Sequence, residues 1–465
     1  MLSSMSYDEA LDFLVGLTKF GFNFGLQRIE CLLQLLGDPH RKLRVIHIGG
    51  TNGKGSTAMM TASVLDAAGY RVGLFTSPHL DSYTERYLIN RVPISEPELA
   101  ELISRVRPHL EQMVRDGHEH PTEFEVCTAI AFLYFSEEQV DFLVLEVGLG
   151  GAIDSTNIIP TPLAAVITNV AFDHIDYLGN TIKDIATVKA GIIKQGGYAV
   201  TAAFDQEALD VIMARCREVG ASLLRVGVDL GYELIESTPS GTSFNLRSPW
   251  GDYPAQWAPL AGQYQAINAA TALGVIEVLR RRHGVQITAE QIRAGLAAAR
   301  WPARLELLSE SPAVLVDVTH NHDGSRKLRE ALQEIYHYRR LILVLGMLGD
   351  KEREKVVGEL APLASLVVIT KPNSPRAGDW ELLATEARRY VDHVLQVEEI
   401  TAAVDAALKE AGCEDLVCVT GSFYMVAEAR AYLRRKLQIS GKTLAVSGTA
   451  TAIPVIQQLQ SKSTS

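Results

Sequence analysis

The sequence has few cysteines and no long apolar segment. Its five cysteines are scattered over 465 residues, and none forms a C-x-x-C pair. This usage is typical of reduced thiols and does not favour a disulfide framework. No apolar run is long enough to span a bilayer, and the first residues lack the basic and apolar regions of a signal peptide. These absences predict a soluble cytoplasmic protein.

The chain also has fewer basic residues than acidic ones. The chain has 44 Lys and Arg against 55 Asp and Glu, a net charge of −11 at pH 7. Because nucleic acids and anionic membranes attract basic surfaces, this balance argues against both as partners, although a local basic pocket could still hold a nucleotide. The length exceeds that of one typical hydrophobic core, so we expect two or three domains.

What the sequence does contain is a glycine-rich loop between a predicted strand and a predicted helix. The segment 44–57 reads RVIHIGGTNGKGST. Its glycines allow backbone N–H groups to face an anion, and the helix N-terminus and Lys54 add positive charge. The spacing differs from the common G-x-x-x-x-G-K-[ST], because Gly55 separates Lys54 from Ser56. The alternative is a tight strand–helix turn with an exposed lysine, which this setting disfavours. The nucleotide contacts predicted for this loop are Asn52, Gly53, Lys54, Gly55, Ser56 and Thr57.

Polar residues follow other predicted strands, where open α/β sheets bind ligands. Segment 76–80 (TSPHL) follows strand 71–75, and Glu146 ends strand 141–148. A carboxylate beside a phosphate loop can hold its Mg²⁺; the alternative is a surface glutamate. His174 follows strand 163–168, and from spacing alone it could equally be a ligand or a satisfied polar group.

The pattern of strands and helices restarts near residue 300. Up to that point, predicted helices alternate with strands, and residues 198–250 carry mixed strand and helix signals. Beyond it, the βαβ rhythm of a mostly parallel sheet appears, with strands predicted at 313–318, 341–345, 366–370, 393–397 and 416–420. We therefore expect an α/β protein with domains at 1–299 and 300–440. The tail 441–465 is rich in Ser, Thr and Gln, and we expect its end to be loose.

Several motifs stand in a recognisable order: GTNGKGST at 50–57, TSPHL at 76–80, TEFE at 122–125, LEVGLGG at 145–151, DH at 173–174, KAGI at 189–192, WPARLE at 301–306, DVTHNHDG at 317–324 and GSFYMVAE at 421–428. Together they resemble the folylpolyglutamate synthases, including the bifunctional dihydrofolate synthase branch of the Mur ligase superfamily. The resemblance covers roughly residues 5–436.

The resemblance implies a P-loop ATPase-like central domain followed by a smaller Rossmann-like domain. It also implies a reaction that joins the carboxylate of a folate to the amino group of L-glutamate and splits ATP to ADP and phosphate through an acyl phosphate. Dihydropteroate is a further expected acceptor. ATP, two Mg²⁺ ions and a monomeric enzyme complete the expectation.

The resemblance also assigns roles to single residues. Lys54 and Ser56 would hold the triphosphate and first Mg²⁺, Glu146 and His174 would bind metal, and Lys189 would act in carbamylated form. The other assignments are adenine and ribose contacts for Asn268 and Asp317, phosphate contacts for Arg304 and His320, a pterin and aminobenzoate pocket with His79 and Phe124, and a glutamate site near Ser422. The expected catalytic residues are Lys54, Lys189, Arg304 and His320.

Three positions depart from the family pattern, and we expect them to alter the substrate. Ala152 replaces a common arginine, Val188 a common glutamate, and Tyr264 the usual histidine. Without the resemblance, Lys189 would be interpreted as a solvated helix lysine, and His322 as a surface residue. Two other functions stay open: another amino-acid ligase of the superfamily, and a nucleotide-dependent binding protein without ligation.

Overall fold

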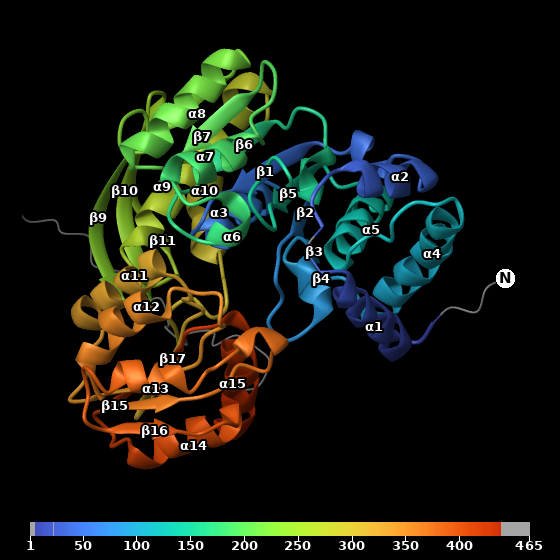
Figure 1. Cartoon of the computed structure of the whole chain (residues 1–465). Helices are drawn as coiled ribbons and strands as arrows, with labels where there is room; N and C mark the ends of the chain where they lie inside the picture. Colours follow the sequence, from blue (N-terminus) through green and yellow to red (C-terminus); the bar gives the residue numbers. More distant parts are fainter. Residues whose placement is uncertain (1–4, 22, 439–465) are drawn as a thin grey trace, which may run out of the picture.

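The computed structural model describes residues 5–21 and 23–438, and the predicted tail 441–465 lies outside this range. Within the described residues, the blue-to-green part of the chain is built on one large sheet with a small sheet beside it. The orange-to-red part forms a second α/β unit (Figure 1). The predicted α/β class is confirmed.

The large sheet has the strand order β4-β3-β2-β5-β1-β6-β7-β8. Strands from β2 to β8 in this order are parallel, whereas β3 and β4 run antiparallel at one edge. The strands are β1 (Val45–Gly49), β2 (Val72–Phe75), β3 (Tyr87–Ile89), β4 (Val92–Pro93), β5 (Phe142–Glu146), β6 (Ala164–Ile167), β7 (Tyr198–Thr201) and β8 (Ser222–Arg225).

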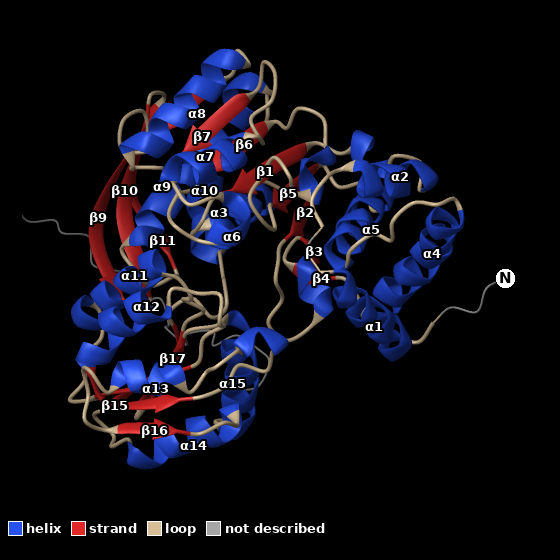
Figure 2. Ribbon diagram, viewed as in Figure 1, coloured by secondary structure: helices blue, strands red, loops and turns tan. Residues whose placement is uncertain are grey.

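Apolar side chains leave both faces of this sheet, so helices cover both (Figure 2). In β1, Ile46 and Ile48 join one core cluster and Val45 joins another, as the alternation of strand side chains requires. One face packs against α3 (Lys54–Ala67), α9 (Tyr264–Arg282) and α10 (Ala289–Ala298). The opposite face is covered by α1 (Tyr7–Gly16), α2 (Gln27–Leu35), α4 (Glu96–Arg115), α5 (Glu123–Glu137), α7 (Ile182–Ala190) and α8 (Gln206–Glu218). A single helical turn, α6 (Ile175–Leu178), precedes α7.

Part of the segment 198–250 forms a separate antiparallel sheet. Its strands are β9 (Gly231–Thr238), β10 (Gly241–Ser248) and β11 (Gly251–Ala258). The mixed signal predicted for this region is therefore right only as far as β8. The Gly- and Ser-containing turns after that point close hairpins, and Phe244, Leu246 and Tyr253 pack this sheet onto the core around α9.

The second sheet has the order β12-β13-β17-β14-β15-β16. Its strands are β12 (Glu306–Glu310), β13 (Ala313–Val316), β14 (Leu341–Leu345), β15 (Ala364–Ile369), β16 (Val394–Gln396) and β17 (Leu416–Thr420). One face packs against α11 (His322–Glu334), α12 (Arg353–Leu360) and α13 (Leu382–Ala387), and the other against α14 (Ile400–Glu410) and α15 (Phe423–Lys436). The sequence analysis missed β12, an antiparallel edge strand that carries polar residues and no apolar run.

Residues 299–305 connect the two sheets, because α10 ends at Ala298 and β12 begins at Glu306. The domain division between residues 299 and 300 stays a prediction. No described helix is both long and apolar enough to cross a membrane. All five cysteines are free.

Candidate active site

The glycine loop at the end of β1 packs tightly against the side chains of Asn268 and Trp301. Gly53 has φ of 87°, and a Cβ there would lie 2.6 Å from Asn268 Oδ1 on α9. A Cβ on Gly55 would lie 2.7 Å from the Trp301 ring. Helix α3 begins at Lys54, directly after Gly53. Glycine is therefore required at positions 53 and 55 for this packing, and the helix that begins beside them has the kind of N-terminus that binds anions.

Two lysine ammonium groups meet the same carbonyl of this loop. Lys54 Nζ donates to Gly50 O at 3.2 Å and to Thr51 O at 3.0 Å, and Lys189 Nζ donates to Gly50 O at 2.9 Å. Lys189 is 4% exposed, so its interpretation as a solvated helix lysine is wrong. Burial, with a smaller contribution from Lys54, lowers the pKa of Lys189 to about 7. Its amine is thus close to half neutral near physiological pH.

Glu146 ends β5 as a buried carboxylate, which excludes the surface-glutamate alternative. The backbone N–H of Ser77 donates to its Oε2 at 3.3 Å. Burial raises the pKa of Glu146 to about 6, although Lys54, the Ser77 N–H and Arg304 act in the opposite direction. The carboxylate therefore faces cationic groups from both sheets.

Asp173 lies at the centre of a charged cluster that joins the two domains. Lys351 Nζ lies 2.6 Å from its Oδ1, and the Nε2 atoms of His320 and His174 lie 3.5 and 3.8 Å from its Oδ2. Burial opposes ionisation of Asp173, but the histidines and Lys351 outweigh it and hold its pKa well below the usual range. Burial lowers the pKa of His174 to about 3. The sequence analysis missed Lys351, which has no motif of its own.

His174 is one of the few described side chains with a buried polar atom, its Nδ1, that has no hydrogen-bond partner. The structure brings no group of three His, Cys, Asp or Glu side chains into a metal-binding arrangement anywhere in residues 5–21 and 23–438. The expected metal set of Ser56, Glu146 and His174 contains only two such residues. A metal there would need oxygens from the nucleotide or water.

An amide network extends the contact between the domains from the phosphate loop. Asn52 Nδ2 donates to Asp323 Oδ2 at 2.9 Å and to Asn321 Oδ1 at 3.2 Å, and Asn169 Nδ2 donates to Asp323 Oδ2 at 3.0 Å. Asn321 Nδ2 also donates to Asp173 Oδ2 at 3.2 Å. The side chain of Asn52 therefore points to the second domain.

Arg304 and Asp317 occupy adjoining loops of the second domain. The residues on either side of Arg304, Ala303 and Leu305, have φ of 54° and 46°, an uncommon backbone for side chains of this kind. Asp317 holds this loop, because its Oδ2 accepts the Leu305 N–H at 2.9 Å. Burial lowers the pKa of the Arg304 guanidinium, while Asp317, Tyr264 and Glu146 act to raise it.

Ser422 precedes α15 and is 1% exposed. In the described structure its Oγ makes no hydrogen bond. His320 Nδ1 lies 3.0 Å from Val318 O, which leaves Nε2 directed at Asp173. His322 instead pairs with Glu359 at 3.0 Å, with 37% of its side chain exposed, in keeping with the surface position predicted for it.

Of the expected acceptor residues, His79 lies in the loop whose Ser77 N–H contacts Glu146. His79 Nδ1 accepts from Arg86 Nε at 3.0 Å, and its ring lies 4.2 Å from that of Tyr83. Burial, with Arg86 second, lowers the pKa of His79 to about 3, so the ring is neutral. Arg86 also pairs with Glu123 at 2.9 Å, next to Phe124. The Phe124 ring closes over Gly148, where a Cβ would lie 2.4 Å from it.

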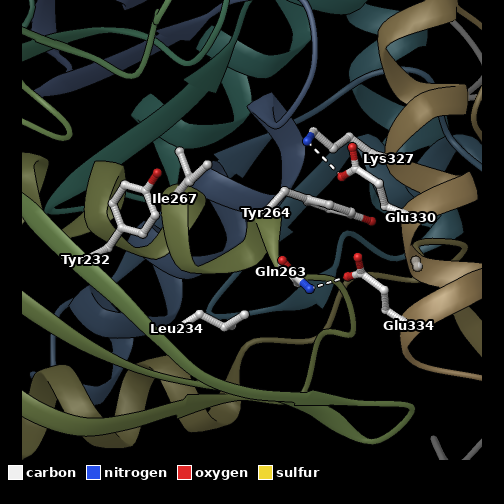
Figure 3. A pocket seen from close by; sticks show the side chains of 9 residues that line it. Tyr232, Leu234, Gln263, Tyr264, Ile267, Lys327, Glu330 and Glu334 are labelled. Carbon is white, nitrogen blue, oxygen red and sulfur yellow. Dashed lines mark hydrogen bonds and ion pairs between the residues drawn. The ribbon is translucent and has the colours of Figure 1, made fainter.

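A cavity of about 160 Å³ opens beside α9 (Figure 3). Tyr264 and Ile267 of α9 line it together with residues of β9 and α11. Figure 3 shows two polar pairs at its rim, Lys327 with Glu330 and Gln263 with Glu334. An aromatic and apolar floor with a charged rim suits a flat heterocycle.

Ala152 and Val188, two departures from the family pattern, touch each other. The Ala152 N–H donates to Val188 O at 2.8 Å, and a Cβ on Gly191 would lie 2.3 Å from Ala152 Cβ. Both positions therefore adjoin the end of α7 that carries Lys189. The third departure, Tyr264, lies in the cavity of Figure 3.

The sequence matches two family models. These are the Mur ligase middle domain, over residues 48–276, and the Mur ligase glutamate ligase domain, over residues 303–423. Together with the phosphate loop and the charged groups gathered from both domains, they define an ATP-dependent amino-acid ligase of the Mur type.

Similar proteins identify the branch. The dihydrofolate synthase/folylpolyglutamate synthase of Bacillus subtilis (strain 168) is 36% identical over 430 residues, covering 92% of this chain and 99% of its own. The structure of Mycobacterium tuberculosis folylpolyglutamate synthase complexed with ADP has a TM-score of 0.85 at 33% identity, covering 92% of this chain and 99% of its own. E. coli FolC in complex with DHPP and ADP has a TM-score of 0.84 at 30% identity, covering 93% and 99%. The chain belongs to the folylpolyglutamate synthase/dihydrofolate synthase family, as its motifs predicted.

Proposed function

We propose that this ligase adds L-glutamate to the carboxylate of a folate at the expense of ATP, and that dihydropteroate is a further acceptor. The observation that carries the proposal is the meeting of Lys54, Lys189, Glu146 and Arg304 at the phosphate loop. The proteins named above as folylpolyglutamate and dihydrofolate synthases support the choice of acceptor.

The chemistry explains why both domains contribute. A carboxylate is a poor acyl donor, so its oxygen first attacks the γ-phosphorus and ADP leaves. The amine of glutamate then attacks the carbonyl of the acyl phosphate, loses a proton and expels phosphate. Negative charge builds on phosphoryl oxygens, and Lys54 and Arg304 are placed to stabilise it. Closure of the two domains would exclude water, which would otherwise hydrolyse the acyl phosphate.

The residues present fit Mg²⁺ held together with ATP. Glu146 offers a buried oxygen ligand with one hydrogen bond, Ser56 a hydroxyl on the loop, and His174 a ring nitrogen with no partner among the described residues. Bound there, Mg²⁺ would neutralise phosphate charge and polarise the reacting phosphoryl group.

We infer that Lys189 is carbamylated in the active enzyme. Carbon dioxide adds only to a neutral amine, and a buried lysine with its pKa lowered to about 7 has one available. The carbamate carries a negative charge, which the adjacent Lys54 would offset.

The nucleotide is proposed to extend from the loop past Asn268, with its ribose near Asp317 and its base in the cavity beside Tyr264. Asn268 supports this path because its side chain lies directly over Gly53. His320 would reach the phosphates, and Ser422, with its buried unpartnered hydroxyl, would contact glutamate. The domain division near residue 300, a monomeric state and a cytoplasmic location stay predictions.

One assay tests the proposal. Phosphate release is measured with tetrahydrofolate and with dihydropteroate separately, each with and without L-glutamate and ATP. The proposal requires turnover that depends on an acceptor and glutamate together, with a glutamylated product found by mass spectrometry. Turnover with dihydropteroate alone as acceptor would restrict the enzyme to the first glutamate addition. Equal ATP hydrolysis with neither substrate would contradict ligation.

A further inference from the structure

Arg430, in the middle of α15, connects the start of β12 in the second domain with a loop of the first domain. Its Nε and Nη2 donate to Glu306 at 2.6 and 2.9 Å, and its Nη1 donates to Asp81 Oδ2 at 3.0 Å. The guanidinium is nearly closed off from solvent, with 4% of the side chain exposed. Glu306 belongs to the second sheet, whereas Asp81 belongs to the loop after β2 in the first domain. A planar guanidinium can hold two carboxylates at once.

On the second-domain side, Glu306 fixes the loop that carries Arg304. Glu306 Oε2 accepts the Ala303 N–H at 2.7 Å, and Asp317 holds the Leu305 N–H. The two carboxylates thus fasten the backbone on both sides of Arg304, in the left-handed conformation that needs such support. Displacement of Arg430 from Glu306 would weaken the support that Glu306 gives to the backbone at Ala303.

On the first-domain side, Asp81 belongs to the loop that carries His79. Glu85 accepts the backbone N–H groups of Leu80 and Asp81 at 2.8 and 3.1 Å. The Leu80 side chain packs against the core of the second domain. The same loop contains Ser77, whose N–H contacts Glu146. The acceptor loop therefore touches the second domain through an ion pair and an apolar contact.

We propose that Arg430 is a positioning residue that couples occupancy of the acceptor site to the placement of Arg304 at the ATP phosphates. The inference rests on the proposed function of this site. An acceptor that fixes the 77–81 loop would fix Asp81, and through Arg430 and Glu306 it would favour the arrangement of Arg304 that binds nucleotide. Binding coupling is reciprocal, so nucleotide should tighten acceptor binding by the same factor.

The test measures this coupling in the full-length protein. The affinity for a non-hydrolysable ATP analogue with Mg²⁺ is determined by calorimetry with and without a saturating folate. We expect the folate to tighten the analogue by about fivefold or more in the unaltered protein, a typical size for such coupling. In Asp81→Ala, which leaves the Arg430–Glu306 pair in place, the factor should fall below about twofold.

The matched control is Asp405→Ala. Asp405 also pairs with α15, through Tyr432 and Lys436 at 2.7 and 2.6 Å, but within the second domain. It should keep the full coupling. Arg430→Lys should retain part of the coupling, because one ammonium can reach only some of the three bonds.

The possible outcomes distinguish a failure of the role proposed for Arg430 from a failure of the proposed function. Loss of coupling in Asp81→Ala with retention in Asp405→Ala supports the inference. Unchanged coupling in an Asp81→Ala enzyme that still ligates overturns the role of Arg430 alone, as does equal loss in both variants. Absence of acceptor-dependent turnover in the unaltered protein overturns the proposed function and the inference with it.

Discussion

The two domains are bridged at two places that differ in chemistry. At the phosphate loop, amides predominate around one buried pair of Lys351 and Asp173, whose side chains are 7% and 9% exposed. At the acceptor loop, one arginine is shared between Glu306 and Asp81. Lys54 and Arg304 both act on the Glu146 carboxylate, which also accepts the Ser77 N–H of the acceptor loop.

Three of the bridging residues lie in loops that follow parallel strands, whereas Glu306 begins β12 and Arg430 lies on α15. Asp173 follows β6, Lys351 follows β14 and Asp81 follows β2. The carboxyl ends of the two sheets therefore face one another, which is where open α/β sheets place ligands. The second domain is therefore held at two places, by amide hydrogen bonds around a buried ion pair at one and by an arginine shared between two carboxylates at the other.

Removing the charge of Lys54 at the phosphate loop should have a large effect on catalysis. Lys54→Ala should reduce kcat by about 10³-fold or more, the scale of positioned cations in phosphoryl transfer. Folate binding should stay within about twofold, because Lys54 contacts Gly50 and Thr51 and not the acceptor loop. Single-turnover kinetics and folate titration would measure the two effects, and near-normal kcat would contradict the loop assignment.

Removing the Lys351–Asp173 ion pair of the phosphate-side bridge should reduce activity less than Lys54→Ala does. Lys351→Met leaves the Asp173 carboxylate buried without its ammonium partner. Such a loss costs about 3–5 kcal/mol when the charge has no other partner, but His320 and His174 face the same carboxylate. We therefore expect a drop in kcat/KM for ATP of about 10²-fold.

The matched change for Lys351 is Lys436→Met, which removes an exposed lysine paired with Asp405 inside the second domain. This control should change kcat/KM for ATP by less than about twofold, as surface pairs contribute little. A similar loss in both variants would show that general destabilisation, and not the bridge, explains the result. Thermal unfolding of both proteins would decide this.

A third prediction concerns pH and Lys189. Burial lowers its pKa to about 7, so the neutral amine predominates above pH 7 and falls about tenfold for each pH unit below it. Carbamate occupancy and ligation should both decline below pH 7 at constant dissolved carbon dioxide, and added bicarbonate should restore part of the activity. Labelled bicarbonate and carbon NMR would detect the carbamate directly.

The matched variant is Lys189→Ala, which should fold normally but show neither the carbamate signal nor ligation at any pH. Near-normal turnover in this variant would remove Lys189 from the mechanism. An unaltered protein without a carbamate signal at pH 8 but with full activity would show that the free amine is sufficient.

The sequence predicted much of the fold because most of the strands are parallel, apolar and followed by helices. The glycine loop, Glu146 and His174 could be placed because each follows a strand in the chain. The hairpins β9 to β11 and the edge strand β12 could not, because polar and half-exposed strands carry no continuous apolar run.

The contacts between the two domains could not be predicted from the sequence for a different reason, because the partners are far apart in the chain. Arg430 lies 349 residues from Asp81, and Lys351 lies 178 residues from Asp173. Neither Lys351 nor Arg430 belongs to a local sequence motif that would indicate so distant a partner. Asn52 could be assigned to the phosphate loop, but not its contacts with Asp323 and Asn321, since these exist only once the second domain has docked.

The smallest effect should come from a neutral change in the phosphate-side bridge. In Asp323→Asn, the side-chain oxygen can still accept from Asn52 and Asn169, which now donate to Asp323 at 2.9 and 3.0 Å. The charge contribution alone is lost, worth about 1 kcal/mol for a hydrogen bond of this kind, so KM for ATP should rise about fivefold with kcat unchanged. Asp323→Ala removes the acceptor as well, so Asn169 loses this partner and Asn52 Nδ2 keeps only Asn321 Oδ1 at 3.2 Å. It should cost several-fold more. Equal kinetics in the two variants would mean that the charge of Asp323, and not its hydrogen bonds, holds this end of the interface.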